Sequence, residues 1–319
     1  MAAPPPSLLD RRLLFVTGKG GVGKSTVAAA LATLSASSGR RTLLCEVDAK
    51  GDLAHFFEAP ELRFAPREVQ DGLWAMAMDT EESLREYLRI NLRLPVIARL
   101  GPLAHTFDFV ASAAPGVREI LTVGKLAYEV REENYDLVVV DASATGHILG
   151  QLSAPRAIAE LVQVGLIREQ TGWMQDILGD PELTGVLIVT LAEEMPVAET
   201  LELTAALGPR TGVDLAAVVV NRVLPELFAR AEEEVFEQLE TPERRRELSD
   251  AIGHDVDSVL AGARLAVGLR RGRAEHLERL RTDLDPAIPM LYLPELFTRS
   301  HGIRTTRQVA EALGEELGG

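Results

Sequence analysis

The stretch Arg12–Thr26, RLLFVTGKGGVGKST, decides the fold of this chain. Its first part, Arg12–Thr17, is a nearly continuous apolar run, which is typical of a strand that is covered on both faces. Its second part, Gly18–Thr26, has the Gly-x4-Gly-Lys-Ser/Thr spacing of a phosphate-binding loop. The residues that follow have the period of an amphipathic helix. The sequence therefore predicts a strand, a phosphate-binding loop and a helix, in that order.

Each residue type in this loop has a physical reason. Glycines let the backbone curl so that successive N–H groups face an anion, and the positive end of the helix dipole adds to the attraction. Lys24 is long enough to reach the β- and γ-phosphates of a nucleotide, and the Ser25 hydroxyl suits Mg²⁺. We therefore expect ATP and Mg²⁺ to bind here, with the phosphates held by Gly18, Gly20, Gly21, Val22, Gly23, Lys24, Ser25 and Thr26.

A second lysine, Lys19, lies inside the loop, although Lys24 already supplies the cation that such a loop needs. A residue at the start of the loop faces away from its own γ-phosphate. Lys19 is therefore expected to project outwards, towards the nucleotide of a second subunit.

Further apolar, β-branched runs recur between amphipathic segments and predict a doubly wound, mostly parallel α/β sheet. The predicted strands after Arg12–Thr17 are Thr42–Val47, Leu73–Met78, Leu137–Asp141, Gly185–Thr190, Leu215–Asn221 and Pro289–Leu293. Three longer stretches have a helical pattern. Residues 80–132 and 153–182 are expected to form a helical subdomain inserted into a single domain that spans 1–319, and residues 226–283 a charged helical segment.

Composition excludes several classes of function. The 319 residues include 33 basic and 48 acidic side chains, and the resulting net charge of −15 argues against nucleic-acid binding over a broad basic face. The single cysteine, Cys45, excludes a disulfide within the chain, a Cys-x-x-Cys zinc site, an iron–sulfur cluster held by one subunit and a metalloid site built from several thiolates. The six histidines lack metal-ligand spacing. Because neither a signal peptide nor a membrane-spanning run is found, we expect a cytoplasmic protein.

The loop Gly18–Thr26 resembles the deviant Walker A motif of a class of dimeric ATPases. This class includes the partition and septum-placement ATPases and the arsenical-pump-driving and tail-anchored-protein-targeting ATPases. In it the first lysine, here Lys19, contacts nucleotide across the dimer interface, and Lys24 binds nucleotide within its own subunit. The resemblance thus implies ATP hydrolysis in which both lysines are catalytic.

Glu46–Phe57 is similar to the switch I segment of the arsenical-pump and tail-anchored-targeting branch of this class. The likeness implies that Asp48 positions the attacking water and lies near Mg²⁺, since a carboxylate at the end of a strand can orient water towards the γ-phosphate. A helix-capping aspartate is the alternative. The branch usually continues Asp-Pro-Ala-His, whereas Ala49, Lys50 and Gly51 follow Asp48 here.

Asp141–His147, DASATGH, resembles the switch II segment of the same branch, Asp-Thr-Ala-Pro-Thr-Gly-His. An apolar strand that ends in aspartate is the Walker B arrangement, in which the carboxylate lies near Mg²⁺ or its water. The Thr-Gly-His part is the most diagnostic, because partition ATPases typically lack it. The resemblance implies that the γ-phosphate is reported by Asp141, Thr145, Gly146 and His147.

Likenesses also extend to the adenine side of the predicted site. Asn221 falls where the class uses an asparagine amide to bind adenine, and a turn residue is the alternative. Leu293–Phe297 resembles the adenine-side loop of the branch, which implies contacts from Pro294 and Glu295. Glu193, Glu194 and Glu199 fall in an acidic segment that leads into an interfacial helix, and the sequence does not choose among them.

The substrate handled by such an ATPase stays open. Apolar residues of the helical stretches either line a groove for a hydrophobic client helix or form the core of the subdomain. They are Leu92, Leu94, Val96, Ile97, Leu100, Leu103, Phe107, Phe109, Leu161, Val164, Leu166, Trp173, Met174 and Ile177. Residues 110–126 are similar to the actinobacterial members described as anion-transporting ATPases, and Lys125 in this segment is either a contact residue or an exposed helix lysine.

Three functions therefore remain from the sequence. The favoured one is a nucleotide-gated ATPase of the arsenical-pump or targeting type, with a hydrophobic protein client or a membrane partner but no insertion into the membrane. A partition or positioning ATPase ranks second, because the tail Arg304–Gly319 lacks the basic amphipathic helix that binds membranes. A weakly hydrolysing regulatory subunit is the third. The resemblance implies a homodimer, or a heterodimer with a paralogous ATPase subunit.

Overall fold

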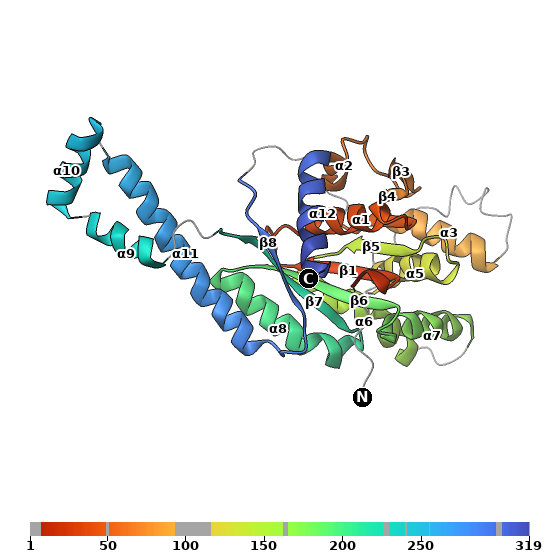
Figure 1. The fold of residues 1–319 in the computed structure, drawn as a ribbon. Helices are drawn as coiled ribbons and strands as arrows, with labels where there is room; N and C mark the ends of the chain where they lie inside the picture. Colours follow the sequence, from red (N-terminus) through yellow and green to blue (C-terminus); the bar gives the residue numbers. More distant parts are fainter. Residues whose placement is uncertain are drawn as a thin grey trace.

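A computed structural model of the chain describes residues 8–48, 51–92, 116–161, 165–225, 230–239, 241–254, 256–297 and 302–318. Its centre is an eight-stranded sheet (Figure 1) with the order β3-β4-β2-β5-β1-β6-β7-β8. The strands are β1 (Leu13–Gly18), β2 (Thr42–Glu46), β3 (Arg67–Gln70), β4 (Leu73–Ala77), β5 (Leu137–Asp141), β6 (Thr184–Leu191), β7 (Leu215–Val223) and β8 (Met290–Pro294). All neighbouring strands are parallel except β3 and β4. The predicted doubly wound, mostly parallel sheet is confirmed.

Helices cover both faces of the sheet, which explains why the central strands are nearly continuous apolar runs. Leu14 and Val16 of β1 pack into one core with α1 and α12, whereas Leu13 and Phe15 pack into a second core with α5, α6 and α8. The helices of the body are α1 (Lys24–Ser37), α2 (Asp52–Phe56), α3 (Thr80–Leu92), α5 (Val117–Arg131), α6 (Thr145–Leu161), α7 (Leu166–Gly179), α8 (Glu194–Thr211) and α12 (Ile303–Gly318).

Helix α12 contains the carboxyl-terminal tail that the sequence predicts to lack a membrane-binding face. Its residues Val309, Ala310 and Leu313 are buried in the core shared with α1. The apolar side of this helix is therefore occupied within the chain. Among the described residues no helix is both long and apolar enough to cross a membrane.

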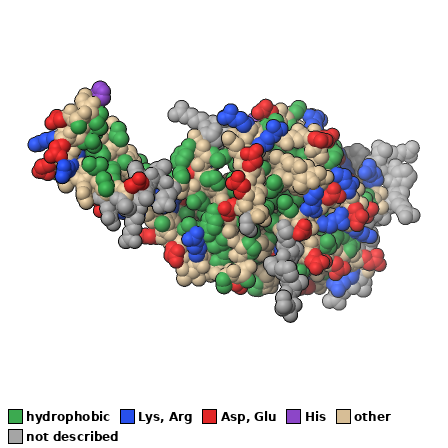
Figure 2. Space-filling model, in the orientation of Figure 1, with side chains coloured by type: hydrophobic (Ala, Val, Ile, Leu, Met, Phe, Trp, Pro, Cys, Tyr) green, Lys and Arg blue, Asp and Glu red, His purple; other side chains and the backbone are tan. Residues whose placement is uncertain are grey.

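Three helices extend from the body as an arm: α9 (Arg230–Leu239), α10 (Pro242–Ile252) and α11 (Asp257–Asp283). Figure 1 shows the arm pointing away from the sheet, and Figure 2 shows hydrophobic side chains along it. Its outer part has a small core of its own, built by Phe236, Val256 and Leu260. These helices lie within the charged stretch 226–283, and the other two predicted helical stretches contain α3, α5, α7 and the second half of α6.

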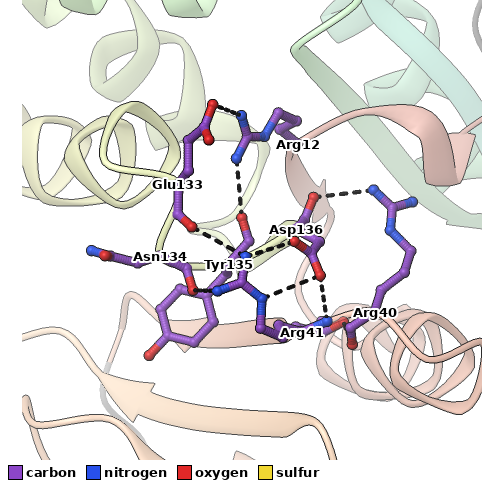
Figure 3. Close-up of polar contacts among 8 residues, drawn as sticks. Arg12, Arg40, Arg41, Glu133, Asn134, Tyr135 and Asp136 are labelled. Atoms are coloured by element: carbon purple, nitrogen blue, oxygen red, sulfur yellow. Dashed lines mark hydrogen bonds and ion pairs between the residues drawn. The ribbon is translucent and has the colours of Figure 1, made fainter.

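A cluster of charged residues ties the amino-terminal ends of β2 and β5 together at the edge of the sheet opposite the phosphate-binding loop (Figure 3). The Arg41 backbone N–H and its Nη2 each donate to the Asp136 carboxylate at 2.8 Å. Arg41 also donates to the carbonyl oxygens of Glu133 and Asn134 at 3.2 and 3.1 Å. The cluster fixes the turn that leads from α5 into β5.

Asp136 should make stability depend on pH in the acid range. Hydrogen bonds from the side chain and backbone of Arg41 lower the pKa of the Asp136 carboxyl. The stabilisation that ionised Asp136 gives to the folded state is therefore complete above the ordinary carboxyl pKa of about 4. It is lost as the pH falls through the lowered pKa of Asp136. We expect Asp136→Asn to lower the urea midpoint slightly at neutral pH but not well below pH 3, with exposed Asp71→Asn as the control. A midpoint difference that is equal at both pH values would contradict the ionic contribution.

Candidate active site

The glycine-rich loop between β1 and α1 is shaped by close backbone contacts. A Cβ on Gly18 would lie 2.1 Å from the carbonyl oxygen of Val189, and one on Gly23 would lie 2.4 Å from Nδ2 of Asn221. Both glycines also have positive φ angles, 151° and 94°. These positions therefore require glycine, because the loop is pressed against the ends of β6 and β7.

The other side of the loop is open. A Cβ on Gly20 or Gly21 would meet no atom within 4 Å. The amino-terminal end of α1 has no side-chain cap, and its first turn contains no acidic residue. The positive end of α1 therefore lacks a side-chain cap and lies beside a loop with open space around Gly20 and Gly21, so the loop fits a phosphate group.

Lys24, Ser25 and Thr26 form the first turn of α1, as the motif predicts. The Lys24 ammonium bends back over the loop and donates to the carbonyl oxygen of Lys19 at 3.4 Å. Ser25 and Thr26 are partly exposed, and Val22 is buried beneath the loop. The two positions that the sequence assigns to phosphate and Mg²⁺ therefore lie at the open end of the helix.

Glu199 on α8 joins the loop to the segment after β5. One oxygen of its carboxylate accepts a hydrogen bond from the Lys19 ammonium, and the other accepts one from the Thr145 hydroxyl at 2.9 Å. The ion pair with Lys19 lowers the pKa of Glu199. In this structure Lys19 is thus held by a carboxylate of its own chain, and the same carboxylate holds the start of α6.

The structure separates the three glutamates that the sequence could not distinguish. Of the three, Glu199 contacts the loop. Glu193 precedes α8 and lies 3.7 Å from Arg273 of α11. Glu194 is exposed in the first turn of α8. A sequence pattern could not show this choice, because Lys19 and Glu199 are 180 positions apart.

Three acidic side chains lie at or just beyond the carboxyl ends of β2 and β5, which are adjacent strands. Asp141 is 7% exposed and pairs in register with Val16 of β1 and with Glu46 of β2. Glu46 is also buried, and the sequence motifs assign it no role. Asp48, two residues further on, is half-exposed, and its Oδ1 lies 3.7 Å from Nη2 of Arg118 on α5. Asp48 and Asp141 are thus both at the edge of the sheet that carries the loop.

The segment Asp141–His147 packs directly behind the loop. The Thr17 hydroxyl at the end of β1 donates to the carbonyl oxygen of Ser143 at 2.8 Å. Thr145 begins α6, and Gly146 and His147 follow it on the exposed surface. Within the described part of the chain the His147 ring forms no hydrogen bond, so the structure links Thr145, but not His147, to the loop.

The residues expected on the adenine side also lie together. Asn221 ends the buried part of β7, and its Nδ2 donates to the carbonyl oxygen of Val22 at 2.8 Å. Val223 pairs with Pro294 of β8, and the Glu295 N–H donates to the Val223 carbonyl at 2.9 Å. Asn221 is therefore a brace for the phosphate-binding loop as well as the residue expected to contact adenine, and a simple turn role does not describe it.

Lys125 is not the exposed helix lysine that the sequence offered as one of two interpretations. It is buried on α5, where its ammonium lies 2.7 Å from Glu86 and 2.6 Å from Glu129. Burial lowers its pKa, but the hydrogen bonds with the two carboxylates outweigh this effect, and the net shift is upward. The interpretation as an exposed helix lysine is wrong, because Lys125 is buried between two carboxylates. Periodicity along α5 could not reveal this, since Glu86 lies on a different helix.

The apolar residues proposed for a groove or a core divide between several environments. Met174 is buried, Trp173 and Ile177 are half-buried, and Leu161 is 83% exposed. Residues 94–109 and Val164 lie outside the described ranges, as do the side chains of Leu92 and Leu166. Across the described ranges, no cluster of three or more His, Cys, Asp and Glu side chains could hold a metal ion by itself.

Comparisons with known proteins agree with this geometry. A family model described as anion-transporting ATPase matches residues 11–172 and 163–257. ATPase BagA of Mycobacterium tuberculosis is 32% identical over 344 aligned residues, which cover 98% of this chain and 95% of that protein. An ATPase ASNA1 homolog of Entamoeba dispar is 24% identical, over 70% of this chain and 82% of its own length. A Halobacterium salinarum protein with the provisional name of an arsenical pump-driving ATPase is 29% identical over 68% of this chain and 36% of its own length.

Proposed function

Because the chain belongs to the anion-transporting ATPase family, and is thus an ATPase that binds nucleotide, we propose that it works as a dimeric, ATP-gated switch in the cytoplasm. The single observation that carries the proposal is the double contact of Glu199 with Lys19 and Thr145. It connects the lysine expected to act on a second subunit with the segment expected to respond to the γ-phosphate.

The site residues have distinct roles in this proposal. Gly18 and Gly20–Thr26 hold the phosphates, and Lys24 neutralises their charge. Ser25 and Asp141, with Asp48 nearby, would hold Mg²⁺, which supplies charge neutralisation at the phosphate oxygens when bound. Asp48 orients the attacking water. Asn221, Pro294 and Glu295 contact adenine from the ends of β7 and β8.

Closure of the dimer requires Lys19 to change partners. Thr145 and Lys19 share the Glu199 carboxylate, so a movement of Thr145 towards the γ-phosphate would remove one of the contacts that fix Glu199. Lys19 is partly exposed and would then reach the phosphates of the facing subunit. The positive charge of Lys19 would thus reach the transferring phosphate only after two ATP-bound subunits have met.

The movement would serve a hydrophobic protein client or a membrane partner, as in the branch that this sequence resembles. Two observations disfavour a partition or positioning ATPase. The apolar side of α12 is buried against α1 and is not free to bind a membrane. The net charge of −15 also opposes binding to DNA.

Light scattering in the presence of Mg²⁺–ADP and then of a non-hydrolysable ATP analogue tests the proposal. The native mass should double with the analogue and stay at that of one chain with Mg²⁺–ADP. A native mass of one chain with both nucleotides would contradict a switch that is formed by two copies of this chain. A paralogous subunit would then be the expected partner.

Weakening the resting contact of Lys19 should promote dimer formation. Glu199→Gln keeps the shape of the side chain but removes its charge, so the variant should dimerise on the order of fivefold more tightly with the analogue, since a partly exposed pair contributes up to ~1 kcal/mol. Glu202→Gln, an exposed position on the same helix, is the matched control. Unchanged or weaker dimerisation of Glu199→Gln would contradict the proposed release of Lys19.

A further inference from the structure

A cavity of about 590 Å³ lies between α3, α5, α6 and α7, away from the nucleotide loop. Its walls are mainly apolar and include Leu84, Ile90, Ile120, Leu121, Trp173 and Met174. The Arg131 guanidinium lies over the Trp173 ring, 5.0 Å from its centre, and fixes one wall. A volume between ~300 and ~1,000 Å³ is typical of sites for small molecules.

The size of the cavity distinguishes a small ligand from a protein client. A membrane-spanning helix is ~30 Å long and ~10 Å wide, which corresponds to a cylinder of more than ~2,000 Å³. The described walls of the cavity enclose less than the volume of such a helix. A compact molecule with an apolar body fits it better.

Charged side chains at the cavity wall indicate the headgroup of this ligand. Lys125 lies between two carboxylates, Glu86 at 2.7 Å and Glu129 at 2.6 Å. Glu129 also accepts a hydrogen bond from Asn134 at 2.7 Å, whereas in the described residues the second oxygen of Glu86 has no donor. One ammonium and two carboxylates leave this half-buried cluster with one negative charge in surroundings of low polarity.

The remaining charges at the cavity do not favour an anion. The third side of Lys125 faces the Phe64 ring, 5.1 Å from its centre, so the ammonium is enclosed. Arg131 is stacked on Trp173 at the exposed rim, and Glu132 beside it adds a further carboxylate. Glu86 lines the cavity and its side chain is 21% exposed, so a cationic group placed next to it would balance the remaining negative charge of the cluster.

We propose that this cavity binds a hydrophobic amine, that is, an alkyl or aromatic body with one protonated nitrogen placed against Glu86. The apolar walls bind the body, and the net negative charge of Glu86, Lys125 and Glu129 selects a cation. This ligand site goes beyond the nucleotide switch and is formed by one chain, so it neither requires a dimer nor depends on ATP hydrolysis.

Calorimetry with the full chain and no nucleotide tests the proposal directly, with decylamine, decanoate and decanol as probes of equal chain length below their micellar concentrations. Decylamine should bind at one site and about tenfold or more tightly than the other two. In Trp74→Phe, which leaves Trp173 as the reporter of the two tryptophans, decylamine should change the emission saturably. Equal binding of decanoate or decanol, or no saturable binding of decylamine, would overturn the assignment.

Substitutions at the cluster test the role of Glu86. Glu86→Gln leaves Lys125 paired with Glu129 and should weaken decylamine binding about tenfold. Glu86→Asp keeps the charge and should restore part of the affinity. Glu82→Gln, on the same helix and paired with Arg85 at the surface, is the matched control and should bind like the unaltered chain. Unchanged affinity in a folded Glu86→Gln protein would contradict recognition of the amine by this carboxylate.

Discussion

Lys19→Ala should lower the rate of ATP hydrolysis by about a thousandfold, which is the effect expected for a cation supplied to the transferring phosphate by a second subunit. ATP binding to the isolated chain should be almost unchanged. The physical reason lies in the loop: the Lys24 ammonium lies over the loop that is expected to hold the phosphates, whereas Lys19 is held by Glu199. Steady-state hydrolysis and equilibrium binding of a fluorescent ATP analogue measure the two quantities separately.

Lys24→Ala is the control that separates the two lysines. It removes the cation closest to the phosphates of its own subunit, so binding itself should be lost. If Lys19→Ala loses binding to the same extent as Lys24→Ala, both lysines serve the same nucleotide and the role of Lys19 in a facing subunit is excluded.

Asp48→Asn should lower hydrolysis by about a hundredfold or more while ATP stays bound, because an amide of the same shape cannot accept a proton from the attacking water. Asp48 is half-exposed at the end of β2 and is not required for folding by any buried contact that the structure shows. The variant should therefore accumulate as an ATP-bound dimer, which light scattering and nucleotide extraction would detect.

Asp136→Asn is a matched control for this substitution, because it changes the same side chain at the opposite edge of the sheet. It should leave hydrolysis unchanged. Unaltered turnover in Asp48→Asn would remove Asp48 as the residue that positions water, and the buried carboxylate of Glu46 would then be the next candidate at this strand end.

The fold was predictable because its signals are local. Leu13 and Phe15 point to one core and Leu14 and Val16 to the other, so β1 is apolar at four successive positions, and a strand of this kind belongs inside a parallel sheet. The loop glycines likewise carry their own signature. β3 was missed because Arg67–Gln70 is a polar, partly exposed edge strand with no apolar run.

The contacts that organise the site were not predictable, because they join residues that are distant along the chain. Glu199 meets Lys19 and Thr145 only after α8 has packed beside β1. Lys125 was misjudged for the same reason, since its partner Glu86 comes from another helix. Asn221 gave a signal for nucleotide contact but none for its hydrogen bond to the loop. Sequence patterns identify which residue types can do chemistry, and tertiary packing decides which of them meet.

The most direct measurement of the central claim, that Lys19 acts on the nucleotide of a facing subunit, is the ATPase rate of Lys19→Ala and Asp48→Asn proteins mixed in equal amounts. Both variants bind ATP, and each alone should be almost inactive. In a mixed dimer the Lys19→Ala subunit keeps Asp48 and receives Lys19 from its partner, so one complete site forms. The mixture should reach about a quarter of the unaltered rate, because random pairing makes half of the dimers mixed and each has one working site. A mixture no more active than the two variants measured separately would show that Lys19 does not act across the dimer.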